Sequence, residues 1–317
     1  MDILIGFTGF VGSNLQSQHK FERVYNSSNI KDAFGTNPDL CVYSGIRAEK
    51  FAADKFPEND LQHIEDAISN IKQIKPKNLV LISTIDVIPA VQSGEVYEDT
   101  PYETKTLTPY GQNRLHLENE IRLQYPDTLI VRLPALFGEG IKKNFVFDLI
   151  NFIPAMLKKE KFTELNAQDD SLRRYYTEDD SNFFRLNGDI TFNERLKLKD
   201  IFQRLGFSAL NFTDSRSCFP FYNLKNLWSH ILDLQSNNVK LAHMAVEPVS
   251  ASEIYQAVYE TGFTNEIVSH PFDYEFFKTR HTDILNGCNG YIFNKNDVLL
   301  EIVDFVKSHT LEGYGNA

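Results

Sequence analysis

The chain has 317 residues, of which 42% are hydrophobic and 24% are charged, and its formal net charge at pH 7 is −11. This length can bury one large or two smaller cores. The negative charge argues against a nucleic-acid binder, because no broad cationic surface is available for phosphates. The cysteines lie far apart without metal-ligand spacing, so we expect no metal site, no disulfide framework and a cytoplasmic location. No apolar run is long enough for membrane insertion.

Three glycines at three-residue spacing follow the first apolar run. Residues 3–5 are predicted to form a strand, and a helix is predicted over residues 12–18. In such a turn Gly6 lets the chain leave the strand, Gly9 keeps side-chain atoms away from a pyrophosphate, and Gly12 lets the helix approach closely. The helix N-terminus adds free N–H groups. We therefore predict a dinucleotide-phosphate site made by Gly6, Thr8, Gly9, Phe10, Val11 and Gly12.

The first half of the chain alternates predicted strands with predicted helices. Further strands are expected at residues 23–25, 40–43, 78–83 and 128–133, and helices at 58–74 and 109–124. Continuous apolar strands separated by helices predict an α/β fold with a Rossmann-type doubly wound parallel sheet. Beyond residue 138 the alternation stops, and helices are expected at 144–160, 194–205, 227–234 and 297–307.

These elements predict two domains. The dinucleotide-binding Rossmann domain is expected over residues 1–140, plus about 217–236, and a smaller C-terminal mixed α/β substrate-binding domain over 141–216 and 237–317.

Tyr110 and Arg114 are four residues apart at the start of the helix predicted at 109–124, so they share one helix face. A nearby cation favours the phenolate form of a tyrosine. Such a tyrosine can act as a general acid or base when a carbinol is oxidised or a ketone is reduced. Thr84 follows the strand at 78–83, and ligands bind at the carboxyl ends of strands in open α/β sheets. We expect these groups to meet at that edge.

At these segments the chain resembles the extended short-chain dehydrogenase/reductase family of nucleotide-sugar epimerases, dehydratases and reductases. The glycine triplet matches the family's GxxGxxG, residues 39–45 resemble its fourth-strand segment, residues 83–87 match its Ser-Ser/Thr-x-x-Val segment, and residues 131–138 resemble its Arg-x-Pro-x-x-Tyr-Gly stretch. The resemblance implies NAD(P) as cofactor, a nucleotide-sugar substrate, and Thr84, Tyr110 and Arg114 as catalytic residues.

Further contacts follow from the same resemblance. They place Ser44, Gly45, Tyr110, Arg114 and Pro134 beside the cofactor, and Ile85, Asp86, Asn144, Arg173 and Arg174 beside the substrate. The family commonly dimerises through the helices that correspond to residues 58–74 and 109–124, which implies a homodimer.

Two positions depart from the family pattern. The family's motif is Tyr-x-x-x-Lys, in which the lysine hydrogen-bonds the nicotinamide ribose, and the resemblance implies that contact for Arg114, which stands here instead. Arginine supplies charge and donors but cannot release a proton. No Asp or Glu ends the strand at 23–25, so Asn26 and Ser27, with Lys31, are left to meet the adenosine ribose. These residues favour NADP over NAD, although backbone and serine contacts would serve either cofactor.

Two functions remain open at this point. The family's 4,6-dehydratases carry an Asp-Glu pair after the catalytic threonine, and Ile85 and Asp86 stand at those positions. A single carboxylate disfavours dehydration, which leaves an NAD(P)-dependent epimerase or ketoreductase acting on a nucleotide-linked sugar. The alternative is a dinucleotide-binding structural or regulatory protein whose catalysis is reduced or lost through Arg114.

Overall fold

The computed structural model describes residues 1–90 and 94–310, and the chain divides into two compact units. The first unit contains Met1–Ile141, Cys218–Val249 and Phe272–Glu301. The second contains Lys142–Ser217, Ser250–Pro271 and the described residues from Ile302 onward. Residues 237–249 and 272–301 thus lie in the first unit, whereas the sequence assigned all of 237–317 to the substrate-binding domain.

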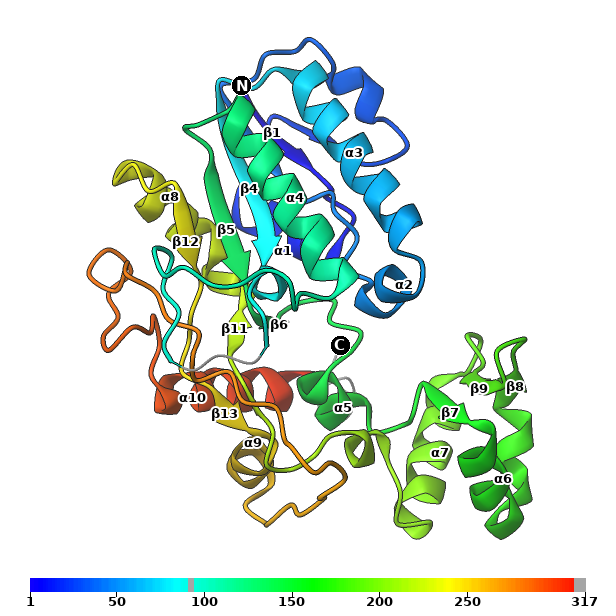
Figure 1. Ribbon diagram of the computed structural model, residues 1–317. Coiled ribbons are helices and arrows are strands. Elements are labelled where there is room, and N and C mark those ends of the chain that lie inside the picture. The colour runs from blue at the N-terminus through cyan, green and yellow to red at the C-terminus, as the bar shows by residue number, and fades with distance from the viewer. Residues whose placement is uncertain (91–93, 311–317) are drawn as a thin grey trace. The chain divides into compact units, whose positions relative to one another are not determined.

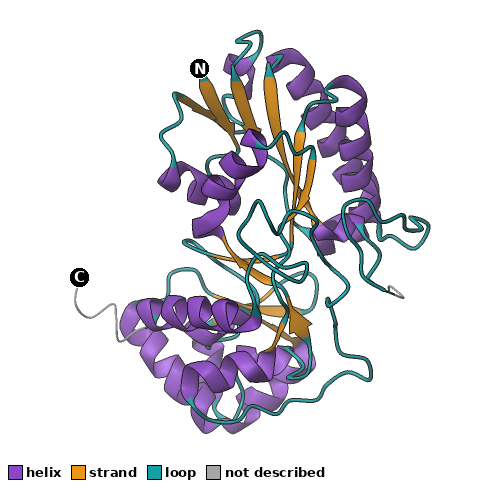
Figure 2. Ribbon diagram, turned by 90° about the vertical axis from the view of Figure 1, so that its left-hand side faces the viewer, coloured by secondary structure: helices purple, strands orange, loops and turns teal. Residues whose placement is uncertain are grey.

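A six-stranded parallel sheet in the order β12-β5-β4-β3-β1-β2 forms the centre of the first unit (Figure 1). Its strands are β1 (Asp2–Ile5), β2 (Arg23–Tyr25), β3 (Leu40–Tyr43), β4 (Asn78–Thr84), β5 (Leu129–Leu133) and β12 (Leu241–His243). Helices cover both faces of the sheet, as Figure 2 shows. The predicted Rossmann-type sheet is therefore confirmed.

The helices of this unit lie close to their predicted positions, except that the helix at residues 50–55 was not predicted. They are α1 (Phe10–Gln18), α2 (Lys50–Lys55), α3 (Pro57–Ile74), α4 (Pro109–Gln124), α8 (Leu227–Ser236) and the start of α10 (Lys295–His309). A second parallel pair joins β6 (Ala135–Phe137) to β11 (Phe221–Asn223), and β10 (Cys218–Phe219) and β13 (Val249–Ser250) are short. The α4 helix begins as its sequence demands, because the Thr108 side chain accepts the Gly111 N–H and Pro109 stands at the first helical position.

The apolar faces of α3 and α4 pack within the first unit. Ile64, Ile68 and Ile71 of α3 and Leu117 and Ile121 of α4 join one core with the strands beneath them. These side chains are therefore not available to a second copy of the chain. The homodimer stays a prediction.

The strand β12 was not predicted. It pairs in parallel with β5 and completes the sheet, but it has three residues and ends in a histidine. A strand that short carries too few alternating or apolar positions to stand out in the sequence.

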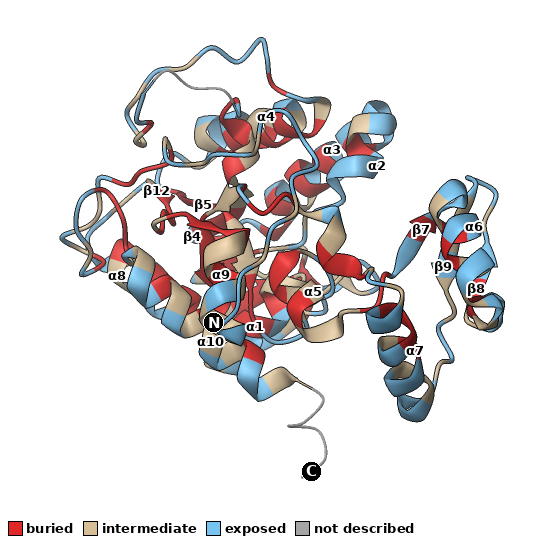
Figure 3. Cartoon of the chain, turned by 90° about the horizontal axis from the view of Figure 1, so that it is seen from below, coloured by how far each residue is buried: buried red, intermediate tan, exposed pale blue. Residues whose placement is uncertain are grey.

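The second unit contains a small lobe with its own core. Its antiparallel strands β7 (Met156–Lys158), β9 (Phe183–Leu186) and β8 (Tyr176–Glu178) pack with α6 (Lys159–Gln168) and α7 (Phe192–Arg204). Their inward faces are buried, as the colouring of Figure 3 shows, around Leu165, Leu172 and Phe202. The unit also holds α5 (Phe145–Asn151) and α9 (Ala251–Tyr259).

The single helix predicted over residues 144–160 is wrong. The α5 helix ends at Asn151, Phe152 has a φ of 58°, and residues 156–158 enter a sheet. Pro154 explains the break, because proline lacks an N–H and disfavours helical geometry at the residue before it.

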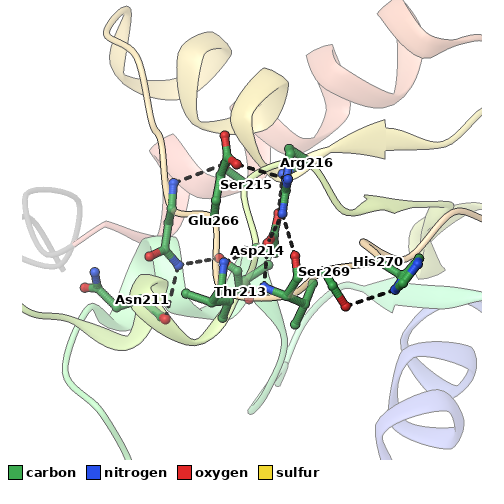
Figure 4. A network of polar contacts seen from close by, with 11 residues as sticks. Asn211, Thr213, Asp214, Ser215, Arg216, Glu266, Ser269 and His270 are labelled. Atoms are coloured by element: carbon green, nitrogen blue, oxygen red, sulfur yellow. Dashed lines mark hydrogen bonds and ion pairs between the residues drawn. The ribbon is translucent and has the colours of Figure 1, made fainter.

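A buried carboxylate joins two distant segments of the second unit. Asp214 accepts hydrogen bonds from Arg216 Nη2 at 2.9 Å and from the backbone N–H groups of Ile267 at 2.8 Å and Val268 at 3.1 Å (Figure 4). The bond from Arg216 holds the pKa of Asp214 below its usual range. This network ties residues 211–216 to residues 265–269.

Candidate active site

The turn between β1 and α1 requires glycine at two positions. Gly6 has a φ of +89°, and a Cβ there would lie 2.7 Å from the backbone of Ser44 and Gly45. A Cβ on Gly12 would lie 2.1 Å from the Gly6 carbonyl oxygen, so glycine lets α1 press against the turn. A Cβ on Gly9 would meet only the Gly6 oxygen, at 3.3 Å, and its outer side is open.

The other predicted cofactor residues of this unit fall around the same edge of the sheet. Ser44 follows β3 and donates its hydroxyl to the Ile5 carbonyl at 2.8 Å. Asn26 follows β2, and its side-chain oxygen accepts the Ser28 N–H at 2.9 Å, while Ser27 is exposed. Pro134 is buried between β5 and β6. Since the strands are parallel, their carboxyl ends meet at one edge.

Gly111 allows the first turn of α4 to approach the end of β4. A Cβ at this position would lie 2.2 Å from the Asp86 carbonyl oxygen. Asp86 belongs to the short helix η2 (Ile85–Val87) that directly follows Thr84. The first turn of α4 is fixed further by Asp54 of α2, which accepts the Tyr110 N–H at 3.0 Å. Tyr110 is thereby held at the same edge as Thr84.

Thr84 and Asp86 bond to each other twice. The Thr84 hydroxyl donates to Asp86 Oδ2 at 3.1 Å, and the Asp86 N–H donates to Thr84 Oγ1 at 3.2 Å. The other carboxylate oxygen of Asp86 accepts a hydrogen bond from the ammonium of Lys50, the first residue of α2. Lys50 was not predicted from the sequence, because nothing in its local pattern shows that α2 reaches the end of β4.

Arg114 is buried, and the two terminal nitrogens of its guanidinium are engaged within the protein. Its Nη1 lies 2.8 Å from Asp60 Oδ2 and its Nη2 lies 2.9 Å from Asp60 Oδ1, while Nη2 also donates to the Arg47 carbonyl at 2.7 Å. The guanidinium carbon lies 4.2 Å from the centre of the Tyr110 ring. Within the described residues, only Arg114 Nε is left without a hydrogen-bond partner on this side chain. Its predicted contact with a cofactor ribose stays a prediction.

Burial and charge act in opposite directions on Tyr110. Burial raises the pKa of its hydroxyl, Arg114 lowers it and Asp86 raises it, and the net direction is upward. The cation does favour the phenolate, as expected, but burial outweighs it in the protein alone. The pKa of Asp60, which burial would raise, is lowered overall by its hydrogen bonds to Arg114 and Asn113.

A buried polar network supports the site from beneath. Glu118 of α4 accepts the Ser83 hydroxyl at 2.6 Å and Arg132 Nη2 at 2.7 Å. Arg132 Nη1 lies 3.2 Å from His243 Nε2, whose ring also contacts the Lys278 carbonyl through Nδ1 at 2.8 Å. Burial lowers the pKa of His243, so the neutral ring donates from Nδ1 and accepts from Arg132. The network fixes α4 against β4, β5 and β12.

The remaining predicted substrate residues have other surroundings. Ile85 is buried beside Val87 in an apolar cluster of the first unit. Asn144, Arg173 and Arg174 belong to the second unit, where Asn144 caps α5 by accepting the Phe147 N–H at 3.2 Å. Their contacts with a substrate stay predictions. None of the described helices has the length and apolar character needed to cross a membrane.

Solved structures identify the fold. No family model and no curated protein matches the chain. A dTDP-4-dehydrorhamnose reductase from Yersinia enterocolitica is 14% identical, with a TM-score of 0.63, over 97% of this chain and 99% of that one. A dTDP-4-dehydrorhamnose reductase from Bacillus anthracis in complex with NADP is 12% identical, with a TM-score of 0.60, over 97% of each chain.

A third solved structure extends the likeness to an epimerase. The UDP-N-acetylglucosamine 4-epimerase from Methanobrevibacter ruminantium, in complex with UDP-N-acetylmuramic acid, is 12% identical, with a TM-score of 0.60, over 96% of each chain. The chain therefore has the fold of the extended short-chain dehydrogenases/reductases, in agreement with the resemblance noted in its sequence. At these identities the likeness defines the fold and nothing finer.

Proposed function

We propose that the protein is an NAD(P)-dependent reductase or epimerase of a nucleotide-linked sugar. The observation that carries this proposal is the close approach of Gly111, next to Tyr110 in α4, to Asp86, which follows Thr84 at the carboxyl edge of the sheet. The glycine turn after β1 opens at that same edge. The solved structures that share the fold include enzymes of both reaction types, which supports the proposed class.

The residues around the glycine turn fit a dinucleotide. A Cβ at Gly12 would collide with the turn, whereas Gly9 is exposed and offers backbone rather than side chain to a phosphate. No carboxylate ends β2, and Asn26, Ser27 and Lys31 stand where an adenosine ribose would bind, which supports a preference for NADP. The bound dinucleotide would supply or accept the hydride.

The side chains of the protein would transfer the proton of the reaction. For a ketone, the Tyr110 hydroxyl would donate its proton to the oxygen that gains the bond, and for a carbinol it would accept that proton. Arg114, stacked on the Tyr110 ring and anchored by Asp60, would stabilise the phenolate without exchanging a proton itself. Thr84 would hold the reacting oxygen. Arg114 thereby keeps the charge of the family's lysine, while its terminal nitrogens are bonded to Asp60 and Arg47.

The competing function is a dinucleotide-binding protein without turnover. The bonds of the Arg114 terminal nitrogens to Asp60 and Arg47 favour this binding function, because these nitrogens are not free to reach the ribose as the family's lysine does. The two are separated by incubating the purified protein with NADPH or NADH and a panel of nucleoside-diphosphate sugars and their 4-keto forms. Oxidation of the nicotinamide, or conversion of one sugar epimer to another, supports the enzyme. Dinucleotide binding with no conversion of any member of the panel supports the binding protein.

A further inference from the structure

Lys50 is joined to the catalytic edge through one carboxylate. Its ammonium pairs with Asp86 Oδ1, and Asp86 Oδ2 accepts the Thr84 hydroxyl at 3.1 Å. The Lys50 side chain is 48% exposed and the Asp86 side chain 24% exposed, so the pair borders solvent at the site. An ammonium, a carboxylate and a hydroxyl thus form a continuous chain that ends at Thr84.

This chain fixes how Thr84 meets a ligand. A threonine hydroxyl has one proton to donate and can accept two hydrogen bonds. In Thr84 the proton is directed to Asp86, and one acceptor position receives the Asp86 N–H at 3.2 Å. The remaining acceptor position suits a hydroxyl donor on a ligand. A rotation of Asp86 would release the Thr84 proton, so whatever holds Asp86 also sets the role of Thr84.

Lys50 pairs with a carboxylate that acts on Tyr110. The charged and titratable groups that face Tyr110 or the Lys50–Asp86 pair come from several elements: Asp54 of α2, Asp60 of α3, Arg114 of α4 and Tyr274 of the 272–301 segment. Asp86 raises the pKa of Tyr110. Burial would lower the pKa of Lys50, but Asp86 raises it overall, so Lys50 stays charged at neutral pH.

We propose that Lys50 is a positioning residue of the Thr84–Tyr110 centre and acts through Asp86. Its ammonium holds the carboxylate that orients the Thr84 hydroxyl, and its charge offsets the effect of that carboxylate on Tyr110. The part of this proposal that concerns catalysis rests on the proposed function. The effect of the Lys50 charge on Tyr110 concerns the protein alone and can be measured without any enzymatic turnover.

The test uses the full chain with 3-fluorotyrosine in place of Tyr110, read by fluorine NMR. Fluorination makes the phenol more acidic, which lowers the pH range over which it titrates, and the label reports one residue. Lys50→Met should lower the acid dissociation constant of this phenol about threefold, because the Asp86 charge is no longer offset. Lys50→Arg should restore the wild-type titration, since arginine can bond the same carboxylate.

Two further variants separate this role from a general effect of charge or of misfolding. Lys55→Met removes a cation from the same helix and should leave the titration unchanged. Asp86→Asn combined with Lys50→Met should differ less from wild type than Lys50→Met alone, because loss of the carboxylate charge lowers the pKa of the phenol while loss of the ammonium raises it. Circular dichroism of every variant confirms the fold.

Three results would overturn the proposal: an unchanged titration in a folded Lys50→Met protein, an equal change in Lys55→Met, or a change in the double variant as large as in Lys50→Met alone. Where the wild type converts a nucleotide sugar, Lys50→Met should lower kcat about tenfold, with dinucleotide affinity unaltered. A wild type without turnover whose phenol still responds to Lys50 would refute the proposed function and leave this inference standing.

Discussion

The Arg114–Asp60 pair offers the sharpest test of how the tyrosine helix is held. Their side chains are 4% and 10% exposed, and two nitrogens of the guanidinium bond both oxygens of the carboxylate. Removing one partner of such a pair leaves a buried charge without compensation, which typically costs about 3–5 kcal/mol. Asn113 still donates to Asp60 at 2.9 Å, so we expect Arg114→Met to cost about 3 kcal/mol, at the lower end of that range.

The double variant is the more informative measurement. With Asp60→Asn and Arg114→Met together, no buried charge remains unpaired, and the loss should be about 2 kcal/mol or more smaller than the sum of the two single losses. The protein has a single tryptophan, Trp228 of the first unit, whose fluorescence reports urea unfolding of the unit that contains the pair.

Acid should weaken this pair. Because the pKa of Asp60 is lowered in the folded protein, its contribution is present above the unfolded pKa and is lost as the pH falls through the folded one. The difference in the free energy of unfolding between wild type and Asp60→Asn should therefore become smaller in acid. At a pH above the unfolded pKa of Asp60, a loss in the double variant equal to the sum of the two single losses would refute the argument that the pair is a coupled buried unit.

Other predictions follow from single positions. Gly9→Val should weaken dinucleotide binding at least tenfold in calorimetric titration, whereas Gly188→Val, whose Cβ would meet nothing within 4 Å, should not; equal affinities would contradict the phosphate site. Burial raises the pKa of Asp148 to about 7, so this carboxyl destabilises the fold as the pH rises from its unfolded pKa toward 7. Asp148→Asn should therefore raise Tm at pH 8 and have little effect at pH 4, and a lower Tm at pH 8 would count against it. Sedimentation at micromolar concentration should give a homodimer, and a monomer would contradict that prediction.

The sequence predicted the sheet well because its signals are local. Apolar runs such as residues 78–83 and the regular spacing of Ile64, Ile68 and Ile71 identify their elements without knowledge of the rest of the chain. The glycine turn was predictable for the same reason, since the backbone collisions at Gly6 and Gly12 involve neighbouring segments.

The support of the site was not predictable, because it joins residues far apart in the chain. Lys50 reaches Asp86 across 36 positions, and Asp60 reaches Arg114 across 54. Which acid on α3 faces Arg114 depends on the rotation of two helices about each other, and no single segment records that. The sequence therefore predicted a cofactor contact for Arg114 but not its bonds to Asp60 and Arg47.

The central claim is that Tyr110 transfers the proton in a nicotinamide-dependent reaction on a nucleotide-linked sugar. The most direct measurement compares turnover by wild type, Tyr110→Phe and Tyr125→Phe, the last being a tyrosine at the far end of the same helix. We expect a loss of about two to four orders of magnitude in Tyr110→Phe, with dinucleotide affinity retained and Tyr125→Phe close to wild type. An active wild type with an equally active Tyr110→Phe variant would contradict it.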